Sequence, residues 1–246
     1  MTTVAPNIRL SNFRLRYQKT EILNLSSLTL QAGKWSCLLG QSGVGKSSLL
    51  RVIASLDDDW LIEGKVEFDT GNSDVAYMGQ KAFLMPWLSV LENVQLGSIL
   101  RGDKRDEERA RDLLSKVGLG DYIKHKPAQL SGGMQQRVVL ARTLMEDRAT
   151  ILMDEPFSAL DAVTRHELQA LTYDLLKGRT VLLVTHDPLE ALRLGDVIYV
   201  LEGRPAKLLP EMRLATNAPR QVGDREVDEL YPDLMGVLSK AERVQT

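Results

Sequence analysis

The feature that most constrains this chain is a glycine-rich loop, Gly40-Gln-Ser-Gly-Val-Gly-Lys46-Ser47, which follows an apolar run at 35–39 and precedes a helical stretch at 47–56. It fits the phosphate-binding pattern G-x-x-x-x-G-K-[ST] without a mismatch. Glycines permit a tight turn and let backbone N–H groups approach phosphate oxygens closely. With a strand before it and a helix after it, the loop predicts a nucleoside triphosphate site that opens an α/β unit.

Each part of the loop has an expected task. The Lys46 ammonium should meet the β- and γ-phosphates, the Ser47 hydroxyl should bind Mg²⁺, and the following helix directs its positive end at the anion. Taken alone, the motif leaves open a glycine-rich turn with a surface lysine. The residues that we expect to contact the nucleotide here are Gly40, Gln41, Ser42, Gly43, Val44, Gly45, Lys46, Ser47 and Ser48.

Two adjacent carboxylates, Asp154 and Glu155, end an apolar run at 151–153. The first is expected to hold Mg²⁺. The second is expected to polarise the attacking water as a general base. Adjacent acids at a strand end are often a solvated turn, but the phosphate-binding loop upstream argues for the metal and base roles.

Composition excludes several classes of protein. The chain has 246 residues, of which 43% are hydrophobic and 26% charged, as in an ordinary soluble globular protein. A net charge of −2 gives no electrostatic reason to expect nucleic acid or an anionic membrane as the main partner. Because Cys37 is the single cysteine, no internal disulfide is possible, and we expect the protein to reside in a reducing compartment. Cys37 itself is expected to be a small buried apolar residue. No signal peptide or membrane-spanning stretch is recognisable.

The order of elements indicates an α/β protein. Strands are expected in the first 30 residues and at 35–39, 62–68 and 74–78, and helices from about 88 to 145. Three further apolar runs at 150–153, 180–184 and 196–201, separated by helices, predict a parallel sheet covered on both sides. Beyond Gly203 the chain looks linker-like, before one amphipathic helix. Its apolar residues are Val227, Leu230, Leu234, Leu238 and Ala241.

The segment Leu130-Ser131-Gly132-Gly133-Met134-Gln135-Gln136-Arg137 resembles the signature sequence of ATP-binding cassette (ABC) ATPases. Gln80 is similar to the Q-loop glutamine of this family, Ser158-Ala-Leu-Asp161 to its D-loop, and His186 to its switch histidine. Tyr17 lies 29 residues before Lys46, as the adenine-stacking aromatic of the family does. The resemblance runs from about residue 7 to 203.

This resemblance implies a fold and its divisions. The fold is α/β, the P-loop NTPase fold of ABC ATPases: a mostly parallel RecA-like sheet with helices on both faces, an N-terminal antiparallel β-subdomain and an inserted α-helical subdomain. The nucleotide-binding domain would cover residues 1–204, with the helical subdomain at about 84–146. A C-terminal extension with one helix would cover 205–246.

The resemblance also implies ATP and Mg²⁺ as ligands, and a homodimer in which one subunit's signature meets the nucleotide of the other. It assigns catalytic roles to Glu155, His186 and Gln80, and metal binding to Ser47, Gln80 and Asp154. Two alternatives stay open: His186 as a packed histidine and Tyr17 as a core residue. The further residues expected at the nucleotide are Tyr17, Ser131, Gly132, Gly133, Gln135 and Asp161.

The segment 84–94 is similar to importer ATPases for nitrate, sulfonates, taurine and thiamine precursors. This implies a transmembrane permease that contacts the region around Trp87, a solute-binding protein acting indirectly, no nucleic acid, and a cytoplasmic location on the inner face of the membrane. Trp87 could instead cap the core of the helical subdomain, and the solute could be another small organic nutrient. A non-transport ABC ATPase is the alternative class, but the chain has neither a second motif set nor sustained heptads.

Overall fold

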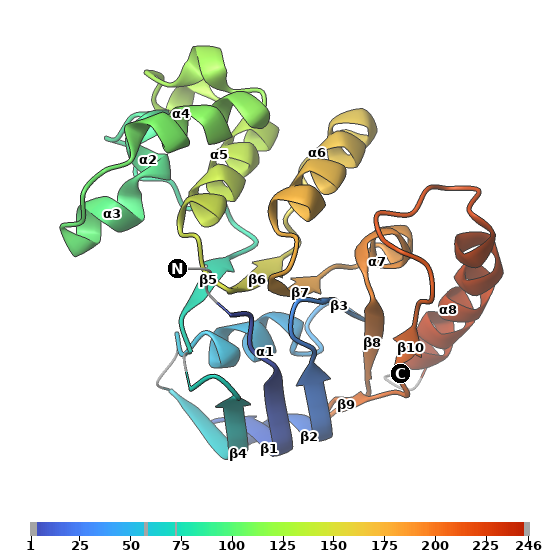
Figure 1. The fold of residues 1–246 in the computed structure, drawn as a ribbon. Helices are drawn as coiled ribbons and strands as arrows, with labels where there is room; N and C mark the ends of the chain where they lie inside the picture. The colour runs from blue at the N-terminus through green and yellow to red at the C-terminus, as the bar shows by residue number, and fades with distance from the viewer. Residues whose placement is uncertain (1–3, 57–58, 72, 244–246) are drawn as a thin grey trace. The chain divides into compact units, whose positions relative to one another are not determined.

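The computed structural model describes residues 4–56, 59–71 and 73–243. These residues form two compact units. The first takes in the described residues up to Val75, then Ala149–Asp154, then those from Lys177 onward; the second takes in Ala76–Arg148 and Glu155–Leu176. The chain therefore leaves the first unit and returns to it twice (Figure 1).

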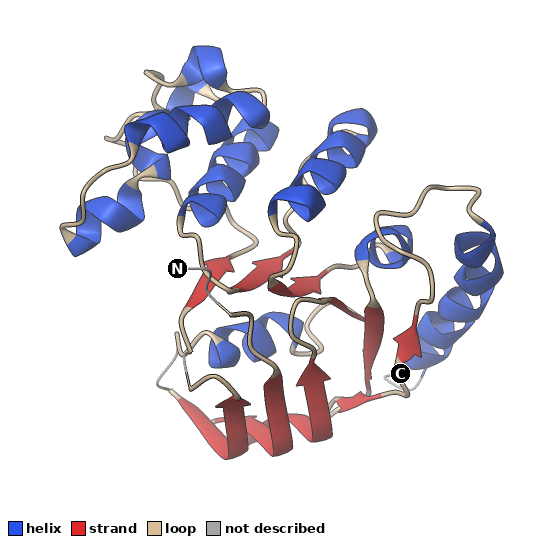
Figure 2. Ribbon diagram, viewed as in Figure 1, coloured by secondary structure: helices blue, strands red, loops and turns tan. Residues whose placement is uncertain are grey.

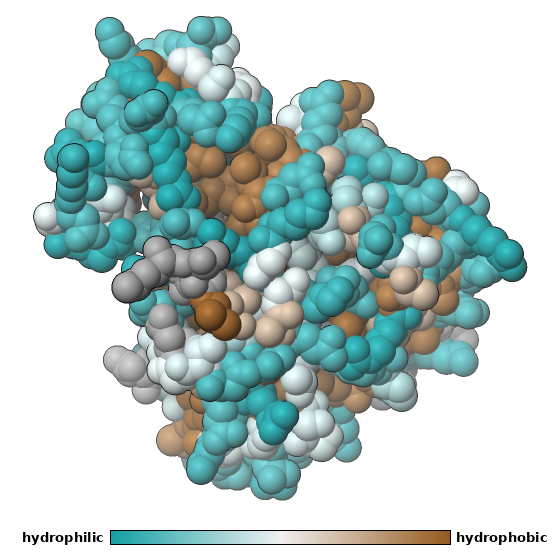
Figure 3. Space-filling model, viewed as in Figure 1, coloured by the Kyte–Doolittle hydropathy of each residue, from teal (hydrophilic) through white to brown (hydrophobic). Residues whose placement is uncertain are grey.

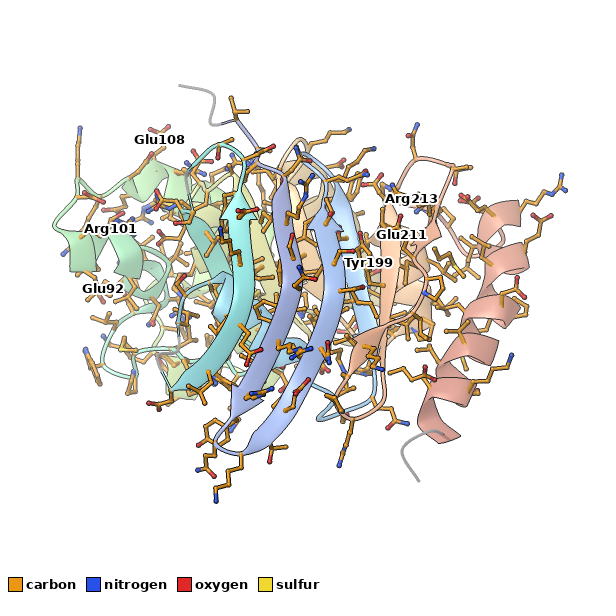
Figure 4. All side chains as sticks on the ribbon, turned by 90° about the horizontal axis from the view of Figure 1, so that it is seen from below. Glu92, Arg101, Glu108, Tyr199, Glu211 and Arg213 are labelled. Carbon is orange, nitrogen blue, oxygen red and sulfur yellow. The ribbon has the colours of Figure 1, made fainter. Side chains whose placement is uncertain are left out.

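An antiparallel sheet opens the first unit. It contains β1 (Ile8–Tyr17), β2 (Thr20–Leu30) and β4 (Trp60–Phe68) in the order β2-β1-β4, seen from below in Figure 4. Buried and exposed residues alternate along β1, as in a sheet with one covered face. Gly64 has φ +92°, and a Cβ there would lie 2.5 Å from the Asn12 carbonyl oxygen, so the close approach of β4 to β1 requires glycine. The expected antiparallel β-subdomain is confirmed.

A second sheet in the first unit contains parallel strands β3 (Trp35–Gly40), β6 (Thr150–Asp154), β7 (Thr180–Val184) and β8 (Val197–Glu202), with the short β10 (Met212–Arg213) beside β8. These strands follow the order β10-β8-β3-β7-β6. Every residue of β6 and β7 is buried, which confirms the prediction of strands covered on both faces. Helices α1 (Lys46–Ile53) and α7 (Pro188–Leu194) both contact β3. Strand β5 (Val75–Met78) leads from the first unit into the second.

The second unit is mainly helical (Figure 2). Its helices are α2 (Val90–Val94), α3 (Leu96–Arg101), α4 (Glu107–Lys116), α5 (Gly132–Met145) and α6 (Ala162–Leu175), with short 3₁₀ turns at Gly120–Tyr122 and Pro127–Gln129. Serine or aspartate caps the N-terminus of α2, α4, α5 and α6, as expected for residues whose side chains accept from free backbone N–H groups. Helix α5 packs against α2 and α4.

The C-terminal segment differs from the sequence prediction. It is not a linker, because β9 (Lys207–Leu208) and β10 (Met212–Arg213) both pair antiparallel with β8. Two-residue strands are too short to leave an alternating pattern in the sequence. The predicted amphipathic helix is present as α8 (Arg225–Arg243), which packs against α7 and β8.

A buried arginine joins this segment to the C-terminal end of α7. Arg220 is 2% exposed, and its Nη1 donates to the carbonyl oxygens of Leu192 at 3.0 Å and Gly195 at 2.8 Å. Its Nε lies 3.2 Å from the carboxylate of Glu226, in the first turn of α8. Burial opposes ionisation of Glu226, but hydrogen bonds from Thr216 and from the backbone of residues 215–216, together with the charge of Arg220, lower its pKa from 4.5 to about 2.

We expect Glu226→Gln to destabilise the protein by roughly 2–3 kcal/mol at pH 7, because it leaves the Arg220 charge buried beside a neutral amide. The folded-state pKa of Glu226 is below its unfolded value, so the contribution of the carboxylate is full above about pH 4.5 and is lost as the pH falls towards about 2. Denaturant unfolding of both proteins from pH 7 down to pH 3 should show the difference shrinking below pH 4.5. A difference that does not change with pH would contradict the assignment.

Candidate functional site

The phosphate-binding loop turns between β3 and α1 through positions that only glycine fills without strain. Gly40 has φ +149°, and a Cβ there would lie 2.9 Å from the Leu201 carbonyl oxygen. Gly45 has φ +110°, and a Cβ there would lie 2.9 Å from Leu23 Cδ2. The loop is therefore pressed between β8 and the start of β2, and its path depends on the absence of side chains.

Lys46 lies inside the curve of this loop. Lys46 is only 6% exposed, and its Nζ donates to the carbonyl oxygens of Gly40 at 2.6 Å and Gln41 at 2.8 Å. Lys46 is also the first residue of α1, so the ammonium and the free N–H groups of the first helical turn lie together. This arrangement suits an anion with several negative oxygens.

His186 follows β7 at the same edge of the sheet. The backbone N–H of Thr185 donates to the Leu38 carbonyl oxygen at 3.2 Å, which continues the β3–β7 pairing up to the residue before His186. Asp187 then caps α7 by accepting from the Leu189 N–H at 2.9 Å. His186 itself is exposed, so the alternative of a packed histidine is wrong.

A cavity of about 380 Å³ joins His186 to the loop within the first unit. Part of its wall is formed by α8, which the sequence did not indicate, because the helical period of Leu238 and Ala241 predicts that they are buried but not which residues they pack against. The lining residues are Leu39, Gly40, Gln41, Ser42, His186, Leu238 and Ala241.

The donors for Mg²⁺ predicted in this unit are oxygen atoms. Asp154 ends β6 and is 4% exposed, so its carboxylate is fixed by the sheet. Ser47 is exposed in the first turn of α1. A hydroxyl and one carboxylate, completed by phosphate oxygens and water, form the kind of ligand set that Mg²⁺ prefers, so these residues fit the ion.

In the second unit, the predicted general base bonds to the Q-loop residue. Gln80 Nε2 donates to Glu155 Oε2 at 3.0 Å. Glu155 has φ +49°, an uncommon conformation for a residue with a side chain, and its carbonyl oxygen accepts from Ser158 Oγ at 3.0 Å. The structure thus brings together two residues that are 75 positions apart in the chain.

The signature and the D-loop also meet within the second unit. Ser131 caps α5 by accepting from the Met134 N–H at 3.3 Å, and a Cβ on Gly133 would lie 3.2 Å from the Ala159 carbonyl oxygen. Asp161 caps α6, and the hydrogen bond from the Thr164 backbone lowers the pKa of the Asp161 carboxyl. Ser131 and Gly132 are exposed. The start of α5 is thus exposed to solvent at Ser131 and Gly132, and the positive end of a helix dipole favours an anion there.

Gln135 has a task inside the chain. Its Nε2 donates to the Pro127 carbonyl oxygen at 3.0 Å, which ties α5 to the preceding 3₁₀ turn. Contact of Gln135 with nucleotide therefore stays a prediction.

Cys37 is fully buried, as predicted from the sequence, and burial raises the pKa of its thiol well above the usual value.

Tyr17 is not a core residue. Its exposed fraction is 46%, and its ring centroid lies 5.1 Å from that of Trp60. The alternative of a core tyrosine is therefore wrong, and stacking on adenine stays a prediction. The sequence did not indicate that Trp60 lies beside Tyr17, because this pairing is known only from the register of β1 with β4.

The exposed aromatics of the segment between Gln80 and α2 form a second feature of interest. Trp87 and Phe83 are each 69% exposed, so the alternative that Trp87 caps a core is wrong. Buried Asn93 donates through Nδ2 to the carbonyl oxygens of Met85 and Leu88 at 3.2 Å, and so braces the backbone on both sides of Trp87. The surface in Figure 3 is mostly hydrophilic with a few apolar patches, and firmly held exposed aromatics on such a surface are typical of contact sites.

Comparison with known proteins agrees with this geometry. Residues 23–158 match the family model described as ABC transporter. An uncharacterized ABC transporter ATP-binding protein of Haemophilus influenzae is 44% identical over 93% of this chain and 97% of its own length. The aliphatic sulfonates import ATP-binding protein SsuB 1 of Rhodococcus jostii is 41% identical over 92% of this chain and 91% of its own.

Solved structures show the same fold. A dimeric ATP-binding cassette in a post-hydrolysis state, bound to ADP and Pi, aligns with a TM-score of 0.75 and 33% identity over 85% of this chain and all of that one. An α/β nucleotide hydrolase with a phosphate-binding loop is thus the class that fold and site define. The chain belongs to the ABC transporter family, and within it to the ATPase subunits, which bind and hydrolyse ATP.

Among the described residues, no helix combines the length and the apolar character needed to cross a membrane.

We expect Glu155→Gln to keep ATP binding and to lower the turnover of ATP by roughly 10²–10⁴-fold, because an amide cannot accept the proton of the attacking water. Phosphate release measures turnover, and equilibrium binding of labelled ATP measures affinity. Glu167→Gln, on the exposed side of α6, is the matched control and should behave as the parent. Hydrolysis by Glu155→Gln at the parent rate would show that Glu155 is not the base.

Proposed function

We propose that this chain is the ATPase subunit that powers a membrane importer for a small solute, with an aliphatic sulfonate as the favoured substrate class. The observation that carries this proposal is the similarity to sulfonate-import ATP-binding proteins, 41% identical in Rhodococcus jostii and 42% in Pectobacterium atrosepticum. Nitrate, taurine, a thiamine precursor or another small organic nutrient is the alternative substrate. A non-transport ABC ATPase is the alternative class, and no observation on this chain favours it.

In the proposed reaction, the loop N–H groups and Lys46 bind the β- and γ-phosphates at the start of α1. Mg²⁺, held by Ser47, Asp154 and Gln80, would supply positive charge against the phosphate oxygens. Glu155 accepts a proton from water as the water oxygen attacks the γ-phosphorus, and ADP leaves. His186 holds the γ-phosphate from the end of β7.

We also propose that the active form is a homodimer with ATP between two chains. Each chain has two helix starts suited to anions, one at Lys46 in the first unit and one at Ser131 in the second. Head-to-tail pairing about a two-fold axis would bring the Ser131 end of one chain to the nucleotide of the other, and this symmetry is the commonest among oligomers. The dimeric cassettes among the solved relatives support this arrangement.

Mixing two inactive variants tests the shared site. Lys46→Ala removes a chain's own phosphate contact, and Ser131→Arg blocks the signature that it presents to a partner. Each homodimer then has two defective sites, whereas the mixed dimer has one site with both defects and one intact site. We expect the mixture to regain a measurable fraction of parent ATP hydrolysis. If a mixed dimer forms, as shown by pull-down of differently tagged chains, but hydrolysis stays at the mean of the two variants, the shared-site model is wrong.

The permease is proposed to dock on the segment that carries Phe83 and Trp87, which would place the protein on the inner face of the membrane. This segment follows Gln80, whose side chain donates a hydrogen bond to Glu155, so a contact there would be linked to the proposed base through a few residues of backbone and one hydrogen bond. A solute-binding protein would act through the permease, and nucleic acid has no part in the proposal.

For the domain organisation, we propose a nucleotide-binding domain at 1–204. A helical subdomain would lie within it at about 84–146, and a C-terminal extension would follow at 205–246.

Uptake of a labelled aliphatic sulfonate tests the substrate and the docking surface together. A strain without the gene should lose uptake, and the parent gene should restore it. Trp87→Ala should restore less than about a tenth of uptake, since aromatic residues that become buried when two proteins bind often dominate the interface energy. The isolated variant should hydrolyse ATP at the parent rate. Val222→Ala, at an exposed apolar position in the other unit, is the control. Unchanged sulfonate uptake in the deletion strain would rule out the substrate class, and equal loss of both activities would assign Trp87 a folding role.

A further inference from the structure

The tip of the β1–β2 hairpin lies just beyond the phosphate-binding loop. A Cβ on Gly45 would lie 2.9 Å from Leu23 Cδ2 and 3.0 Å from Ile22 Cγ2, so the beginning of β2 is in contact with the last part of the loop. Thr20 comes two residues before Ile22 and pairs with Tyr17. At about 3.3 Å per residue, Tyr17 is roughly 7 Å along the strand from this contact.

Tyr17 also lies on the face of the sheet that meets the loop. Phe13 and Leu15 are fully buried and alternate with exposed neighbours, and Tyr17 continues their row by one step. Leu15 pairs with Leu23, the residue against the loop. Tyr17 therefore lies where the row of core residues ends, and its ring is at the surface.

Trp60 is directly opposite Tyr17 on the neighbouring strand. The register of β1 with β4 pairs the two residues, and cross-strand partners share a face. Their ring centroids are 5.1 Å apart and their planes are inclined at 49°. Because the rings are tilted and not stacked face to face, they form an aromatic corner in which Tyr17 keeps an exposed surface.

We propose that Trp60 is a second aromatic residue of the site that binds the nucleotide base, and that the corner of Tyr17 and Trp60 is built for a two-ring purine. The inference rests on the proposed stacking role of Tyr17. One ring lies against the face of the base and the other meets its edge, the two arrangements that aromatic quadrupoles favour. A purine spans both rings, whereas a one-ring pyrimidine reaches only one, so Trp60 raises the preference for ATP over CTP.

The test compares a ligand that has a base with one that has none. Trp60→Ala should weaken the affinity for ATP by roughly 2- to 10-fold and leave the affinity for inorganic tripolyphosphate unchanged, since tripolyphosphate meets only the loop. It should also reduce the factor by which the protein binds ATP more tightly than CTP. Trp60→Phe keeps an aromatic ring and should retain most of the affinity for ATP. Leu61→Ala, the next residue on β4 and on its other face, is the control and should change neither ligand.

Fluorescence gives a readout that a merely structural role would not change. ATP should alter the tryptophan emission of the parent, tripolyphosphate should not, and Trp60→Phe should abolish the response to ATP. Equal weakening of ATP and tripolyphosphate in Trp60→Ala would show that Trp60 only supports the loop, and would overturn the inference. If Tyr17→Ala weakens ATP while Trp60→Ala does not, the inference fails and the role of Tyr17 stands. If neither variant weakens ATP, both are wrong.

Discussion

The parallel pairing of β3 between β7 and β8 is the interaction on which the rest of the first unit depends. It buries β3 on both sides and brings the carboxyl ends of parallel strands to one edge of the sheet. The phosphate-binding loop leaves from the end of β3, Asp154 ends β6, and His186 follows β7. Because all three positions are set by backbone hydrogen bonds in a buried sheet, their spacing does not rely on surface side chains.

The chemistry of the second unit has a different basis. There the candidate residues lie at helix starts and in turns. Ser131 and Asp161 are fixed because their side chains cap α5 and α6, and the backbone around Trp87 is held by hydrogen bonds from Asn93. The first unit ends at Asp154 and the second resumes at Glu155, so a single peptide bond joins the residue proposed to bind the metal to the residue proposed to activate the water. The positive φ of Glu155 shows how sharply the backbone turns there.

Those parts of the molecule that follow from local sequence patterns could be predicted from the amino-acid sequence. Fixed spacing identified the loop, the acidic strand end and the signature, and two-sided apolar runs identified β6 and β7. The sequence could not show what depends on partners distant in the chain: the pairing of Tyr17 with Trp60, the hydrogen bonds of Arg220 to Leu192 and Gly195, and β9 and β10. Exposure was equally out of reach, because nothing in the sequence showed that Phe83 lies at the surface as Trp87 does.

The place of α8 has a consequence for the cavity beside the phosphate-binding loop. Its last turns bring Leu238 and Ala241 to the cavity that Gly40, Ser42 and His186 also line. The same helix packs against α7 and β8, so any change in that packing would alter the cavity wall while the loop itself stayed the same. The shape of the cavity thus depends on the last described helix as well as on the loop whose sequence motif identifies it.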